Sequence, residues 1–250
     1  MWETERMRPA LRPEDRIIVA LDVPTARDAL ALVDELGDLV SFYKFGLELL
    51  MANSVEAEGR EGLLRTLTRD KKVFVDLKLP EIPATAMRVV GVASEVGARL
   101  LTLSNTVARE TIAAAKRGRD GRAWPELLYV PFLSSLDETD FAEMTGQDPS
   151  TFHEHLLRRA RWALDAGVDG FIVSGPEIKV FRDAFPDAPL VSPGIRPAGA
   201  STDDHKRSCT PAEAIRLGAD FIVVGRPVRD APNRRDAVRR IAEEIASAND

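Results

Sequence analysis

Short apolar runs alternate with segments of helical periodicity along almost the whole chain. The runs are continuously apolar, which is typical of strands in a parallel sheet buried on both faces. We predict strands at 16–23, 41–46, 73–78, 99–104, 126–135, 170–175, 189–194 and 221–226. Apolar residues at helical spacing fill the intervening segments, several of which end at a glycine. We predict helices at 26–36, 47–70 with an interruption near Gly59 and Gly62, 84–96, 109–117, 151–166, 177–185, 211–217 and 233–248, with a polar loop at 136–150.

These elements make eight strand–helix units with no change of composition that would mark a linker. Eight such units at this length predict an α/β fold of the (β/α)8 barrel type, also called a TIM barrel, in one domain at 16–250. Residues 1–15, rich in charge and proline, are expected to form an N-terminal arm. The alternative is an open doubly wound sheet, but no G-x-G-x-x-G follows the first strand, where a dinucleotide site would need it.

The composition narrows the function classes. Hydrophobic residues make up 44% of the 250 residues, which is ordinary for a globular protein, and the net charge of −6 argues against nonspecific binding of nucleic acid. A single cysteine, Cys209, excludes an intrachain disulfide, and three scattered histidines do not form a convincing zinc site. The sequence has no signal-peptide core and no run of membrane-spanning length, so we expect a soluble cytoplasmic protein.

Ionisable residues gather where the predicted strands end. Asp76 and Lys78 are two residues apart, so both side chains are expected on one face of their strand, and Pro80 then places Glu81 in the following turn. In a (β/α)8 barrel the carboxyl ends of the strands form the active site. This rule brings the strand-end residues to one mouth: Asp22, Lys44, Asp76, Lys78 and Ser135. The alternative is a structural network of ion pairs that fills the mouth.

A second cluster suits an anion. Gly225 and Arg226 follow the last strand, and the loops after strands seven and eight of such barrels commonly bind phosphate. A glycine lets the backbone approach the anion, and an arginine offers two parallel donors. Pro193, Gly194 and Arg196 add similar groups after strand seven, and the polar segment 195–210 resembles a lid.

Five motifs in this order resemble the orotidine 5′-phosphate decarboxylase family. They are Ala20-Leu-Asp-Val23, Lys44-Phe-Gly46, Asp76-Leu-Lys78 followed by Ile82-Pro-x-Thr85, Pro193-Gly-Ile-Arg-Pro197 and Val224-Gly-Arg-Pro227. The resemblance implies a (β/α)8 barrel that decarboxylates orotidine 5′-phosphate to UMP in pyrimidine biosynthesis. It also implies a homodimer with active sites at the subunit interface and no metal or organic cofactor.

The resemblance also implies a role for individual residues. Lys44, Asp76 and Lys78 would belong to a charged catalytic array completed by Glu81, with Lys78 the proton donor to C6 of the pyrimidine. Asp22 and Thr85 would contact the ribose hydroxyls, with Thr85 reaching across from the partner subunit, and Ser135 would face the pyrimidine ring. Gly225 and Arg226 would hold the phosphate. The remaining substrate-binding positions are Ile82, Pro193, Arg196 and His205.

Three departures from the family pattern fall at the site. Glu81 stands where the family has Asp, His205 stands where it usually has Gln, and 102–108 replaces a strand end that typically contains His and Gly. Two further functions therefore stay open. One is a divergent paralogue that acts on a related phosphorylated substrate, and the other is a weakly active protein that binds pyrimidine nucleotides.

Overall fold

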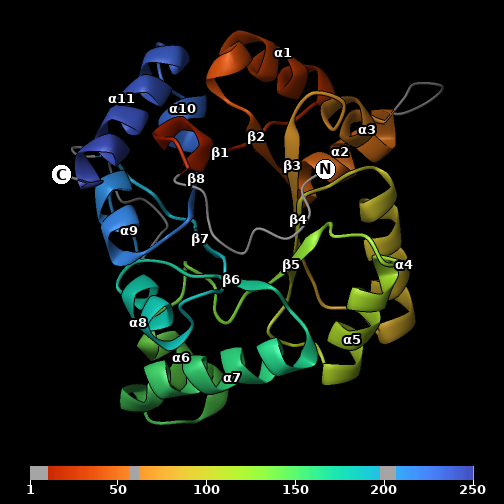
Figure 1. The fold of residues 1–250 in the computed structure, drawn as a ribbon, viewed down its shortest axis with the longest axis vertical. Helices are drawn as coiled ribbons and strands as arrows, with labels where there is room; N and C mark the ends of the chain where they lie inside the picture. Colours follow the sequence, from red (N-terminus) through yellow and green to blue (C-terminus); the bar gives the residue numbers. More distant parts are fainter. Residues whose placement is uncertain (1–10, 57–61, 198–206, 250) are drawn as a thin grey trace.

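The computed structural model describes residues 11–56, 62–197 and 207–249, which form a closed barrel of parallel strands surrounded by helices (Figure 1). Each strand pairs with its neighbours in chain order, and β8 closes the barrel against β1. Within the described residues the strands are β1 Ile17–Ala20, β2 Phe42–Gly46, β3 Lys72–Leu79, β4 Leu100–Leu103, β5 Glu126–Tyr129, β6 Gly170–Ile172, β7 Leu190–Ser192 and β8 Phe221–Val224. The predicted (β/α)8 barrel is confirmed, and the doubly wound sheet is excluded.

Helices follow the strands and form the outer ring in Figure 1. Of the described residues, those in α-helices are α1 Ala26–Leu36, α2 Leu47–Glu56, α3 Leu63–Leu67, α4 Pro83–Glu95, α5 Arg109–Gly118, α6 Glu138–Thr145, α7 Phe152–Ala166, α8 Glu177–Ala184, α9 Pro211–Leu217, α10 Arg226–Arg229 and α11 Arg234–Ala246. Short 3-10 turns lie at η1 Pro13–Arg16, η2 Gly37–Leu39, η3 Pro149–Thr151 and η4 Ser247–Asn249. None of the helices described is long and apolar enough to span a membrane.

The predicted polar loop at 136–150 is wrong, because it contains α6 and η3. Asp137 caps α6 by accepting hydrogen bonds from the backbone of Thr139 and Asp140, and the Asp140 side chain accepts one in return from the backbone of Asp137. Gly146 ends the helix in the left-handed conformation. Phe141 is the one fully buried side chain on this short helix, so its apolar periodicity is weak even though both caps are present.

Two further differences concern the ends of elements. The predicted strand at 126–135 ends at Tyr129, since Pro131 has no N–H to continue a ladder and the chain turns away there. The first part of the predicted arm, residues 1–10, lies outside the described residues. Its end forms η1, and the Arg16 guanidinium reaches the carbonyls of Ala219 and Asp220 at 3.4 and 3.5 Å.

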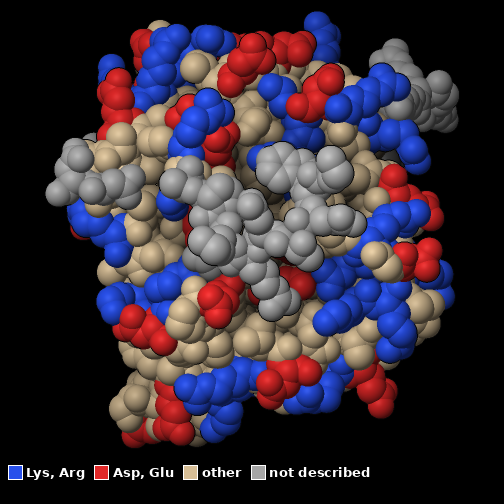
Figure 2. Space-filling model, viewed as in Figure 1, with Lys and Arg blue, Asp and Glu red and all other residues tan. Residues whose placement is uncertain are grey.

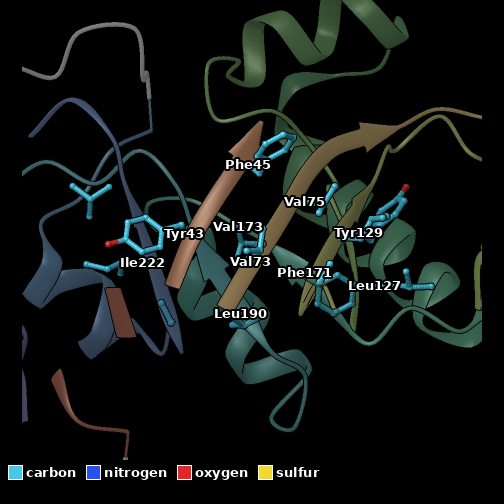
Figure 3. Close-up of a cluster of buried hydrophobic side chains, with 14 of the residues drawn as sticks. Tyr43, Phe45, Val73, Val75, Leu127, Tyr129, Phe171, Val173, Leu190 and Ile222 are labelled. Carbon is cyan, nitrogen blue, oxygen red and sulfur yellow. The ribbon is translucent and has the colours of Figure 1, made fainter. Parts of the chain in front are cut away.

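Apolar side chains fill the barrel in two layers. One layer lies between the strands and the helices and includes Tyr43, Phe45, Tyr129 and Phe171, which project from β2, β5 and β6 in Figure 3. The other fills the barrel interior with side chains that alternate with the first along each strand: Ile18, Ala20, Phe42, Phe74, Leu100, Leu128, Val130, Ile172, Val191 and Val223. Continuing this alternation past the apolar residues brings polar side chains to the end of the interior.

Candidate active site

A cavity of about 630 Å³ opens at the carboxyl ends of the strands. Its walls come from the ends of every strand except β4, as the barrel rule requires of an active site. The predicted site residues that line it are Asp22, Lys44, Asp76, Lys78, Ser135, Pro193, Arg196, Gly225 and Arg226. Figure 2 shows acidic and basic side chains intermingled over one face of the molecule.

Four of these side chains form an alternating charged array. The Lys44 ammonium lies 2.9 Å from Asp22 Oδ1 and 3.8 Å from Asp76 Oδ2. The Lys78 ammonium lies 3.0 Å from Asp76 Oδ1 and 2.9 Å from Asp76 Oδ2. The array therefore runs in the order Asp22, Lys44, Asp76, Lys78, with each charge beside one of opposite sign.

The two lysines differ in their access to the cavity. The Lys44 side chain is 13% exposed and lies between two carboxylates, whereas the Lys78 side chain is 42% exposed. An ammonium group that is bound on one side and open on the other can contact a ligand without first leaving its partner. Lys78 is therefore the cation of the array that is best placed to act on a bound molecule.

Asp76 is the most buried acid of the array, with 12% of its side chain exposed. Burial alone raises the pKa of this carboxyl group. The ammonium groups of Lys78 and Lys44, with hydrogen bonds from Lys78 and Thr102, outweigh burial and leave the pKa below its ordinary value. The lowered pKa favours the ionised carboxylate, which pairs with both lysines.

Thr102 on β4 is a site residue that the motif comparison did not identify. Its hydroxyl donates a hydrogen bond of 2.8 Å to Asp76 Oδ1 and accepts one of 2.8 Å from the backbone N–H of Lys78. It is fully buried. Thr102 lies within the segment that departs from the family pattern, and it supports Asp76 without itself lining the cavity.

The backbone of β3 is irregular at the lysine. The register between β3 and β4 shifts between Val75 and Leu79, and Lys78 has φ 46°, a left-handed conformation that is uncommon for a residue with a side chain. Asp76 and Lys78 do meet, as predicted, but simple strand alternation is not the reason. The hydrogen bond to Thr102 holds the N–H of Lys78 outside the regular ladder.

Two glycines leave room in the site. A Cβ atom on Gly46 would lie 3.1 Å from Lys44 Nζ and 3.4 Å from Asp22 Oδ1, so a side chain there would crowd their ion pair. A Cβ atom on Gly225 would meet its nearest protein atoms at ordinary distances, 3.6 Å from Ala20 and 3.7 Å from Asp22. The space above Gly225 therefore belongs to the cavity.

Three arginines line the same cavity: Arg196, Arg226 and Arg229. Arg229 was not predicted from the sequence. Its guanidinium donates a 2.7 Å hydrogen bond to the backbone carbonyl of Asp22 and two more to Asp230. It lies three residues after Arg226 in α10, and residues at this spacing share a helix face, which is the signal that could have identified it.

Three predicted residues are not brought to the cavity. Glu81 lies on the exposed turn after β3, where its side chain accepts a 3.2 Å hydrogen bond from the backbone of Ile82. Ile82 is 65% exposed, and Thr85 accepts a 3.4 Å hydrogen bond from Arg88. His205 lies outside the described residues. Glu81, Ile82 and Thr85 therefore do not line this cavity.

Apolar groups complete the cavity wall, and the alternation of the strands could have identified several of them. Ala20 and Phe74 precede the polar wall residues Asp22 and Asp76 by two positions, and Val223 precedes Gly225 in the same way. Val130, Phe132 and Ile172 add to this wall. Within the described ranges, no group of three or more His, Cys, Asp or Glu side chains is arranged to hold a metal ion.

A closed parallel barrel with a charged cavity at the carboxyl ends of its strands is the architecture of a (β/α)8-barrel enzyme. Comparison with known proteins shows to which enzyme family the chain belongs. A sequence profile described as the orotidine 5′-phosphate decarboxylase / HUMPS family matches residues 15–241, and the chain belongs to this family.

Named relatives cover nearly the whole chain. The orotidine 5′-phosphate decarboxylase of Rhodopseudomonas palustris is 43% identical over 245 residues, which span 97% of this chain and 99% of that protein. The enzyme of the same name from Methylococcus capsulatus is 42% identical and covers 92% of each chain. The crystal structure of orotidine 5′-phosphate decarboxylase from Lactobacillus acidophilus superposes with a TM-score of 0.77 at 30% identity, over 92% of this chain and 99% of that one.

Proposed function

We propose that this protein is a carbon–carbon lyase that converts orotidine 5′-phosphate to UMP and CO₂ in pyrimidine biosynthesis without a cofactor. The observation that carries the proposal is the array of Asp22, Lys44, Asp76 and Lys78 at the end of the barrel interior. The names of its relatives at 42–43% identity support the same reaction.

The charges account for the chemistry. Loss of CO₂ breaks the bond between C6 and the carboxylate and leaves its electron pair on C6. The ring offers no conjugated position for these electrons, so the carbanion must be stabilised electrostatically. We place the Lys78 ammonium beside C6, where it opposes the developing negative charge and then donates a proton to the carbon. The products are UMP and a neutral lysine, which regains its proton from solvent.

Asp76 has two roles in this scheme. It holds Lys78 through both carboxylate oxygens, and its negative charge fixes the ammonium group in place before the reaction. It also lies where the carboxylate of the substrate would approach, so repulsion between the two would be relieved when CO₂ leaves. Lys44 lies between Asp22 and Asp76 and places a positive charge between the two acids.

The remaining cavity residues would bind the rest of the nucleotide. We assign the phosphate to Gly225 and Arg226, helped by Pro193, Arg196 and His205. Asp22 would contact the ribose hydroxyls, and Ser135 would face the pyrimidine ring. Phosphate binding far from C6 supplies energy that can be used at the reacting carbon.

We further propose a homodimer whose partner completes the site. Glu81, Ile82 and Thr85 do not line the cavity of their own subunit, so they would serve the partner's cavity, with Ile82 and Thr85 contacting the nucleotide there. Large exposed apolar side chains on α2, on α4 and just before α4 support the proposal: Leu47 at 58%, Met51 at 59%, Ile82 at 65%, Met87 at 38% and Val92 at 58%. Exposed apolar surface of this kind marks protein interfaces.

The acidic net charge and mixed surface support a cytoplasmic enzyme whose partners are a small-molecule nucleotide and a second copy of the chain, without nucleic acid or membrane. A second candidate rests on Glu81 in place of the family's Asp. The longer side chain moves the carboxylate by roughly 1.5 Å, and sites of this kind tolerate about 0.5 Å. That change suits a divergent paralogue with a related phosphorylated substrate.

The test is the fall in absorbance when the purified protein meets orotidine 5′-phosphate in the presence of a chelator. We expect fast turnover with UMP as the product. Slow turnover, with another phosphorylated substrate preferred, would favour the divergent paralogue. No turnover with tight binding of UMP would instead indicate a nucleotide-binding protein.

A further inference from the structure

Arg207 is a buried arginine that joins three parts of the barrel mouth. Its Nε donates a 2.9 Å hydrogen bond to the carbonyl of Leu136, and its Nη2 donates one of 2.8 Å to the carbonyl of Leu133. Its Nη1 lies 2.9 Å from Glu177 Oε2, and the side chain is 10% exposed. Each of the three guanidinium nitrogens thus has a partner in the fold.

The turn that Arg207 holds is part of the cavity wall. Leu133, Ser134 and Ser135 all line the cavity, and the two bonded carbonyls bracket this turn. The guanidinium carbon also lies 5.9 Å from the ring centre of Phe132 and 5.5 Å from that of Phe152, so two aromatic rings pack near it. A displacement of the guanidinium would therefore move the wall that carries Ser135.

The other side of Arg207 is anchored in the barrel. Glu177, the first residue of α8, is 2% exposed, so its carboxylate is a fixed partner. Two residues after Arg207, Cys209 pairs with Ile195, and the N–H of Arg196 donates a 3.0 Å bond to the Cys209 carbonyl. The arginine therefore links the turn after β5 to the residues that follow β6 and β7.

We propose that Arg207 is a positioning residue that sets the place of the Leu133–Leu136 turn, and with it the contact between Ser135 and the pyrimidine base. This inference rests on the proposed function, since it assigns the base to that wall. Arg207 itself does not line the cavity and acts through the turn. A substitution of Arg207 should therefore weaken the binding only of ligands that carry a base.

The discriminating variant is Arg207→Lys, which keeps a positive charge for Glu177 but cannot donate in the planar fork that reaches both carbonyls. The ligands are UMP and ribose 5-phosphate, which share the sugar phosphate and differ in the base. We expect the Kd of UMP to rise about tenfold or more while that of ribose 5-phosphate changes little. For orotidine 5′-phosphate we expect KM to rise more than kcat falls, because the base contact is made before and during the reaction.

The matched control is Arg182→Lys. Arg182 is also a buried arginine that donates to several carbonyls, including those of Gly218 and Ala188, and pairs with Asp220, but it does not line the cavity. It should lower stability without changing the ratio of the two dissociation constants. Glu177→Gln provides a second variant if Arg207→Lys folds poorly, and it should shift the same ratio in the same direction by a smaller factor.

An unchanged ratio of dissociation constants in folded Arg207→Lys, or in Glu177→Gln if the first variant does not fold, would overturn the inference. An equal rise in the Kd of UMP and of ribose 5-phosphate would also overturn the inference, because it would indicate a general structural role for Arg207. Turnover by the wild-type protein tests the proposed function separately. If the wild type decarboxylates orotidine 5′-phosphate and the ratio does not move, only the role of Arg207 fails.

Discussion

The Lys78 ammonium contacts both carboxylate oxygens of Asp76, at 3.0 and 2.9 Å. The acid is buried and the lysine is half exposed to the cavity, so the pair presents a fixed positive charge to a ligand. The left-handed backbone of Lys78 and the hydroxyl of Thr102 maintain this arrangement. This arrangement can be tested at Asp76, Thr102, Glu81 and Arg226.

The first prediction concerns pH and Asp76. Its pKa is lower in the folded protein than the ordinary 3.8, so its stabilising contribution is complete above that value and is lost as pH falls through the folded value. We expect the Tm of the wild type to fall below about pH 4, and Asp76→Asn to flatten that part of the profile. Asp183→Asn, at the exposed pair with Lys179, should leave it unchanged. Parallel profiles for wild type and Asp76→Asn would contradict the assignment.

The second prediction concerns Thr102. Thr102→Val keeps the shape of the side chain but removes the hydroxyl that bonds Asp76 and the N–H of Lys78. We expect the free energy of unfolding to fall by about 1–3 kcal/mol, and turnover of orotidine 5′-phosphate to fall with it because Lys78 loses its support. Thr102→Ser retains the hydroxyl and should behave nearly as wild type. If the Val variant is as stable and active as the Ser variant, the hydroxyl does not support the array.

The third prediction concerns Glu81. If the protein is a family member in which glutamate has replaced the usual aspartate, Glu81→Asp should maintain or raise the turnover of orotidine 5′-phosphate, because it restores the family's side chain. Steady-state kinetics of the two proteins provide the measurement. A collapse of activity in Glu81→Asp would mean that the site has been rebuilt around the longer acid.

The fourth prediction concerns Arg226. Arg226→Ala should raise the Kd of UMP by about 10- to 100-fold, the range expected for a lost charged hydrogen bond. The Kd of uridine, which has no phosphate, should change little. Arg216→Ala, on the outer helix α9, removes the same charge away from the cavity and is the control. Calorimetry with the two ligands makes the comparison. If UMP binding is unchanged in Arg226→Ala, the phosphate site lies elsewhere.

Strand periodicity predicted the barrel and the meeting of Asp22, Lys44 and Asp76, because each continues the inward alternation of a buried strand. The role of Thr102 could not be predicted, since it depends on the register between β3 and β4 and on an irregularity of β3. Helix α6 was missed because its caps are clear but its buried face consists of one side chain. Arg207 is far in sequence from the carbonyls it holds, so only the fold brings them together.

The most direct test of the central claim is the turnover of orotidine 5′-phosphate by Lys78→Ala, with Lys179→Ala as the control that removes a lysine far from the cavity. Circular dichroism should give wild-type spectra for both, because Lys78 lies at the end of β3 and half exposed. We expect kcat to fall by at least roughly a thousandfold in Lys78→Ala and to stay unchanged in Lys179→Ala. Wild-type turnover by folded Lys78→Ala would show that another group stabilises the carbanion and donates the proton.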